Sequence, residues 1–211
     1  MAITATSADF DIVTSAGSLG RNMPQRLGRA LWFPMWIMAA MGFTVGIILA
    51  IVRASEIVDG GDADTIMALK HVVAGFMFIG FASVFAAISF AIARILGEFR
   101  AGGGELQAAT GREVRTLKMP MTAMLFIITM AMAMMTIIVA VVLHFVFAAD
   151  VENTVASLED AEQRFVVLDG IRRIGIATYL VSFLLGLGTI IQVLRFQAIR
   201  IRELAGEATR S

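Results

Sequence analysis

Cysteine is absent from the 211 residues, and histidine occurs only twice. Without thiolates the chain has no disulfides, iron–sulfur clusters or cysteine-ligated metal sites. Charged residues are also scarce, at 16% of the chain, whereas soluble domains have about 25%. Hydrophobic residues make up 58%. This composition excludes an ordinary soluble domain.

Four long stretches contain no Asp, Glu, Lys or Arg, and these are 30–52, 71–93, 119–149 and 174–194. A helix needs roughly 20 apolar residues to cross the hydrocarbon core, and in lipid it satisfies its own backbone. The sequence therefore predicts an all-α integral membrane protein, an antiparallel bundle of four transmembrane helices. The first twenty residues hold Asp9 and Asp11 but no basic residue, whereas a signal peptide needs a basic segment at its start, so we expect the first stretch to be retained. The predicted spans are about 30–53, 66–94, 119–149 and 173–194.

The charges predict the orientation. The N-terminal segment 1–29, the connection after the second span and the C-terminal tail 195–211 hold 12 basic and 7 acidic residues. The other two connections hold 5 basic and 10 acidic residues. By the positive-inside rule both termini are cytoplasmic, in what we expect to be a multi-pass protein of a bacterial inner membrane. We also expect anionic lipid head groups to contact the basic residues after the fourth span, Arg195, Arg200 and Arg202.

Several short motifs predict local structure. The triple glycine at 102–104 suggests a flexible inner loop, and it lacks the Gly-Lys-Ser/Thr of a phosphate loop. Ser157 to Asp160 resembles a capping box, which favours a short outer helix. Gly42 and Gly46 form a small helix face suited to close packing. Nothing here indicates a nucleic-acid partner.

The two histidines, His71 and His144, share a depth in this topology. Each lies near the outer end of its uncharged stretch, about 15 Å from the midplane at 1.5 Å per residue. Two imidazoles at one level on neighbouring helices match the axial ligation of a haem b iron. Arg172 and Arg173, at the outer end of the fourth span, suit its propionates. One haem b is thus the cofactor that the sequence suggests.

Alternatives to haem ligation remain open for these histidines. Imidazoles at a membrane boundary can simply reach water or pack against neighbouring side chains. Copper is another metal that the two histidines could ligate. The third stretch is rich in methionine, a soft ligand suited to Cu(I). Its methionines surround the helix, however, which flexible apolar packing explains better.

The function classes follow largely from absences. No ionisable residue lies near the middle of any predicted span, which disfavours transporters, pumps and voltage sensors. No histidine is paired locally with Asp or Ser, so we expect no enzyme. We expect a non-catalytic subunit that anchors or stabilises a larger, bioenergetic membrane complex, with lipid and other membrane subunits or a second copy as partners. The alternative is a single-haem b-type cytochrome subunit that passes electrons between quinone and a redox partner.

Overall fold

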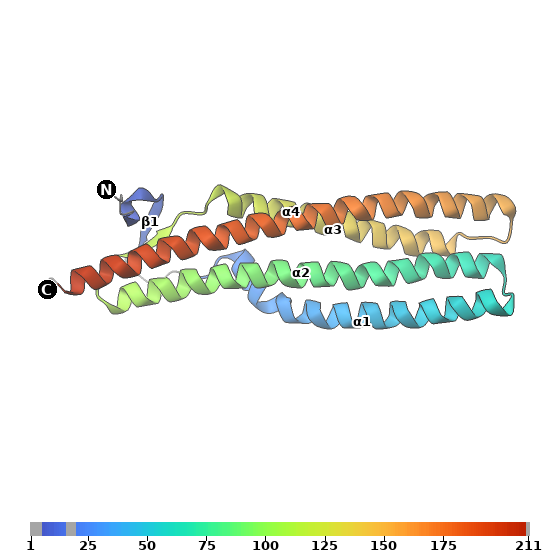
Figure 1. Cartoon of the computed structure of the whole chain (residues 1–211), viewed down its shortest axis with the longest axis horizontal. Coiled ribbons are helices and arrows are strands. Elements are labelled where there is room, and N and C mark those ends of the chain that lie inside the picture. The colour runs from blue at the N-terminus through green and yellow to red at the C-terminus, as the bar shows by residue number, and fades with distance from the viewer. Residues whose placement is uncertain (1–5, 16–19, 210–211) are drawn as a thin grey trace. The chain divides into compact units, whose positions relative to one another are not determined.

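The computed structural model describes residues 6–15 and 20–209, and four long helices dominate it (Figure 1). Each is long and apolar enough to cross a membrane, which confirms the prediction of four apolar helices. A short 3-10 helix and two strands accompany them. In chain order the elements are η1 Ser7–Asp9, β1 Ile12–Ser15, α1 Met23–Asp59, α2 Ala63–Ala109, β2 Val114–Leu117, α3 Met121–Ala149 and α4 Val155–Ala208.

The helices α2 and α4 are much longer than a membrane crossing requires. They have 47 and 54 residues, whereas about 20 residues cross the hydrocarbon core. At 1.5 Å per residue, α4 is about 80 Å long. Each of these helices therefore continues beyond its uncharged stretch as charged helical turns.

The triple glycine at 102–104 lies inside α2 and does not form the predicted flexible loop. A Cβ atom on Gly103 would lie 2.4 Å from Nε2 of Gln197 on α4. That same Gln197 nitrogen donates to the Phe99 carbonyl, and Gln107 Nε2 donates to the Gly103 carbonyl. The loop prediction was wrong because these contacts offset the cost of about 1 kcal/mol that each glycine adds to a helix.

The segment after 150 also differs from its prediction. The helix begins at Val155, so Ser157 lies within α4. Thr154 acts as the cap, because its Oγ1 accepts from the Ser157 N–H at 3.2 Å. The Ser157 hydroxyl accepts in turn from the Glu152 N–H at 2.9 Å. Since α4 then runs on without a break, the predicted separate outer helix does not exist.

The strands β1 and β2 form a two-stranded antiparallel sheet that composition did not predict. Ile12 pairs with Leu117, and Ser15 pairs with Val114. A lone pair of strands is marginally stable in water, so burial on one face matters here. Val114 and Thr116 supply it, with 2% and 5% of their surfaces exposed. The sheet thereby joins the N-terminal segment to the connection between α2 and α3.

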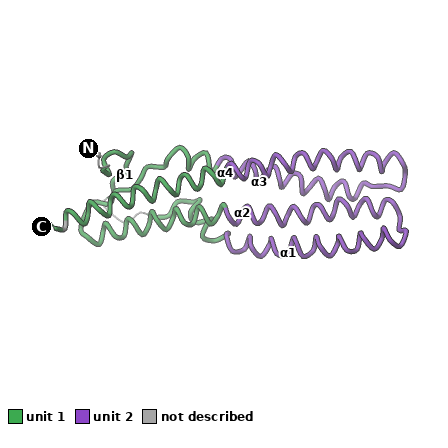
Figure 2. Tube along the Cα trace, in the orientation of Figure 1, with its two compact units in different colours: residues 1–31, 89–127, 182–211 green, residues 32–88, 128–181 purple. Residues whose placement is uncertain are grey.

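The chain divides into two compact units (Figure 2). Unit 1 comprises 1–31, 89–127 and 182–211, and unit 2 comprises 32–88 and 128–181. The division follows the charges, because unit 1 holds 12 of the 17 basic residues with 7 acidic ones, and unit 2 holds 5 basic and 10 acidic residues. The segments predicted to be cytoplasmic are thus assembled in one unit.

Small residues bring the helices of unit 2 close together. A Cβ atom on Gly42 of α1 would lie 2.7 Å from the backbone nitrogen of Gly80 on α2. One on Gly75 of α2 would lie 3.0 Å from the Phe145 ring on α3. These contacts confirm that Gly42 lies on a close-packing face. They also place α2 directly against α3, which sets the position of the histidines.

Candidate functional site

His71 and His144 meet in unit 2, at a contact between α2 and α3. Their Nδ1 atoms are 3.1 Å apart, and the two side chains are 0% and 1% exposed. The depth argument predicted that these residues lie at one level, and the structure brings them into direct contact. Neither histidine reaches the surface, so the interfacial interpretation does not describe their surroundings.

The hydrogen bonds around the pair determine which nitrogen of each imidazole donates and which accepts. His71 Nε2 lies 3.1 Å from the Ala161 carbonyl oxygen, and because a carbonyl only accepts, His71 Nε2 must donate. A neutral imidazole has a single N–H, so His71 Nδ1 accepts and His144 Nδ1 donates. The remaining lone pair is then on His144 Nε2. That atom is buried and has no hydrogen-bond partner among the residues that the structure describes.

Aromatic rings surround the pair. Phe165 of α4 lies edge-on to both imidazoles, with ring centroids at 5.3 Å from His71 and 5.5 Å from His144. Phe78 lies 5.0 Å from His144, and Phe147 lies 6.3 Å from His71. Edge-to-face contacts of this kind stabilise each pair by about 0.5–1.5 kcal/mol. The imidazoles are therefore held in a packed aromatic environment.

The two arginines predicted to hold propionates already have a partner. Arg172 and Arg173 both form ion pairs with Asp169, the latter at 2.7 Å. The Arg172 guanidinium also lies 4.8 Å from the centre of the Phe78 ring, which itself contacts His144. The arginines are thus near the histidine pair, but both are already paired with the single carboxylate of Asp169.

The geometry limits how this site can bind a metal. His144 Nε2 offers a lone pair in the present conformation, whereas both Nδ1 atoms are engaged with each other. An iron ligated by both residues would need the imidazoles to separate. Among the described residues, no group of three or more His, Cys, Asp or Glu side chains is arranged to hold a metal ion.

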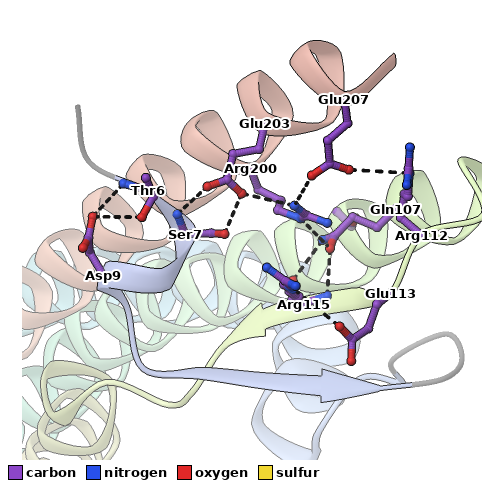
Figure 3. Close-up of polar contacts among 11 residues, drawn as sticks. Thr6, Ser7, Asp9, Gln107, Arg112, Glu113, Arg115, Arg200, Glu203 and Glu207 are labelled. Atoms are coloured by element: carbon purple, nitrogen blue, oxygen red, sulfur yellow. Dashed lines mark hydrogen bonds and ion pairs between the residues drawn. The ribbon is translucent and has the colours of Figure 1, made fainter. Parts of the chain in front are cut away.

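A second polar site, which the sequence did not predict, lies in unit 1 (Figure 3). Arg200 of α4 was expected among lipid head groups, but its side chain is 4% exposed. Its Nη1 lies 3.1 Å from Glu203 and 3.6 Å from Glu207, and its Nε donates to Gln107 Oε1 at 3.3 Å. The expectation for Arg200 was wrong because Gln107 on α2 and two carboxylates on α4 replace the lipid phosphates.

Gln107 and Ser7 extend this site to the strands and to η1. Gln107 Nε2 donates to the Arg115 carbonyl at 2.9 Å, and Gln107 Oε1 accepts from the Arg115 N–H at 2.8 Å. Ser7 donates to Glu203 from both its N–H and its hydroxyl, at 2.6 and 2.5 Å. Four elements are thereby joined. The Arg200 cluster, as we call it, consists of Ser7, Gln107, Arg115, Arg200, Glu203 and Glu207.

One signal in the sequence marks this cluster in retrospect. Arg200, Glu203 and Glu207 are spaced three and four residues apart, so they share one helix face. The same face begins with Phe196 and Ile199, which are 0% and 3% exposed. A charged face that continues an apolar one indicates buried ion pairs. Its partners on α2 and η1 cannot be read from that spacing.

The chain matches no family model, no curated protein and no solved structure.

Proposed function

We propose that the protein is a non-catalytic membrane subunit that anchors or stabilises a larger bioenergetic complex in a bacterial inner membrane. Its four helices cross the bilayer as an antiparallel bundle, with both termini in the cytoplasm. Unit 1 then carries the cytoplasmic extensions of the helices. The partners are lipid and other membrane subunits, or a second copy of the chain.

The observation that carries this proposal is the Arg200 cluster. It joins η1, α2, β2 and α4 through polar contacts that are buried or partly buried. Helix ends and terminal segments that acted independently would not be connected in this way. Side-chain hydrogen-bond networks that link separate elements hold those elements in fixed positions. A rigid extension built from two long helices gives a defined surface for a partner protein.

Exposed apolar side chains on unit 1 support the same role. Val13, Leu106 and Ile201 are 45%, 49% and 52% exposed. They lie outside the four uncharged stretches, so acyl chains do not cover them in the proposed topology. Single exposed apolar residues are common on proteins, but these three stand on a preorganised surface, which is what a docking subunit requires.

Site-specific photocrosslinking in native membranes tests this proposal. A photoreactive residue at Leu106 or at Ile201 should form adducts with a discrete partner protein. The matched control is Ile48 of α1, which is 54% exposed within an uncharged stretch and should crosslink mainly to lipid. Lipid adducts at Ile48 together with no protein adduct at Leu106 or Ile201 would contradict the scaffold role.

The cytochrome alternative is supported by one observation, that α2 and α3 bring both histidines of the chain to one place, although their mutual hydrogen bond must break before both can ligate an iron. In that function the imidazoles separate to ligate one haem b, and the protein transfers electrons between quinone and a redox partner. A reduced-minus-oxidised spectrum of the purified protein tests it. A b-type Soret and α band that is lost in His144→Ala supports a cytochrome, and a featureless spectrum of the folded protein contradicts it.

A further inference from the structure

A cavity of about 110 Å³ lies within unit 1. The walls of the cavity are mixed in character. Its polar lining includes Asn22, Gln25, Arg100 and Gln197, and its apolar lining includes Phe126 and Val193.

Arg100 is the polar group of this cavity that lacks a partner. In the described part of the chain its guanidinium makes no hydrogen bond or ion pair, and its Nε is buried. The other polar side chains are engaged. Asn22 and Gln25 exchange reciprocal hydrogen bonds at the start of α1, and Gln197 donates to a carbonyl of α2. A partly buried cation without a counter-charge is costly, so an anion is the ligand that this cavity favours.

The start of α1 adds positive charge to the same unit. Arg21, Arg26 and Arg29 line a shallow hollow there, and Glu98 forms an ion pair with Arg21 at 2.8 Å. Three arginines and one acidic partner leave a net positive surface, which attracts anions and repels cations.

The position of the cavity along the sequence indicates an amphiphile. Phe126 and Val193 belong to uncharged stretches, whereas Arg100 and Asn22 lie outside them. In the proposed topology, the cavity is therefore at the level of the inner head groups. Basic pockets between helices on this side of a membrane suit anionic head groups.

We propose that this cavity binds one anionic phospholipid, with its phosphate on Arg100 and an acyl chain along Phe126 and Val193. The site depends on the proposed membrane topology. It does not depend on the scaffold role, so a failed crosslinking experiment leaves it standing, and the reverse is also true.

Native mass spectrometry of the full-length protein in neutral detergent tests the proposal. Phosphatidylglycerol should bind with one tight site per chain, at least tenfold tighter than phosphatidylcholine. Arg100→Gln should remove that tenfold preference. Arg112→Gln is the matched control, because Arg112 is an exposed arginine of the same unit outside the cavity, and it should stay within twofold of wild type.

A second variant tests the acyl-chain part of the site separately from the charge of Arg100. Ala123 lines the cavity and is 8% exposed, so Ala123→Leu fills it while Arg100 remains. This variant should also weaken phosphatidylglycerol binding. Unchanged binding in both Arg100→Gln and Ala123→Leu overturns the proposal. Displacement of the lipid by millimolar inorganic phosphate also overturns it, since the cavity would then be a site for free anions.

Discussion

Removing the carboxylates around Arg200 should cost more than removing the arginine itself. Glu203→Gln combined with Glu207→Gln keeps the side-chain sizes but leaves a guanidinium that is 4% exposed without a counter-charge. Breaking a buried ion pair from one side costs about 3–5 kcal/mol.

Arg200→Met is the opposite perturbation, and its expected cost is smaller. The two carboxylates that remain are 24% and 42% exposed, so water can solvate them, and Glu203 keeps its hydrogen bonds from Ser7. The loss is then limited to the bonds of the guanidinium, about 1–2 kcal/mol. The ordering of the two variants follows from burial of the cation alone.

Hydrogen exchange measured by mass spectrometry can resolve this difference locally. In the double variant, the equilibrium constant for local opening of peptides covering 6–15 and 199–208 should rise more than a hundredfold, which corresponds to about 3 kcal/mol. Arg200→Met should increase opening by roughly 5- to 30-fold. Peptides from 128–149 in unit 2 serve as the internal control and should not change. Equal or greater opening in Arg200→Met would refute the reasoning from the buried charge.

Three further outcomes are expected. Gly42→Ala should lower the free energy of unfolding by about 1–3 kcal/mol, because the added Cβ atom would lie 2.7 Å from the Gly80 backbone, which cannot rotate away. An unchanged melting temperature in detergent would contradict this close contact. Gly102→Ala, which meets nothing within 4 Å, should raise stability by up to about 1 kcal/mol, and a loss by the same assay would argue that this part of α2 is not helical. His71→Phe should destabilise more than His144→Phe, by about 1 kcal/mol, because the former removes two hydrogen bonds and the latter removes one. The reverse order in thermal unfolding would contradict the hydrogen bond from His71 to the Ala161 carbonyl.

The apolar helices were predictable because the relevant signal is local. A run of about 20 uncharged residues is a property of one segment, and its helical form follows from backbone hydrogen bonding within that segment. The shared depth of His71 and His144 was predictable for the same reason, since the rise per residue is constant. The grouping of basic segments also reappears as unit 1.

The interior contacts of unit 1 were not predictable in this way. The bond from Ser7 to Glu203 joins residues 196 positions apart, and the bond from Arg200 to Gln107 joins residues 93 apart. Such partners decide that 102–104 is helical and that Arg200 is buried, against the local preferences of glycine and arginine. Similarly, β1 has three β-branched residues that favour a strand, but its partner β2 lies about 100 residues away in the sequence.

The sequence by itself determined four apolar helices, the clustering of charge and the candidate histidines, because composition and helical rise act within a segment. Only the tertiary structure decided that the two imidazoles hydrogen-bond to each other and that Arg100 lines a cavity without a counter-charge. These features depend on which side chains meet across helices. A side chain's partner, more than its own chemistry, decides whether a buried polar group is a structural contact or a binding site.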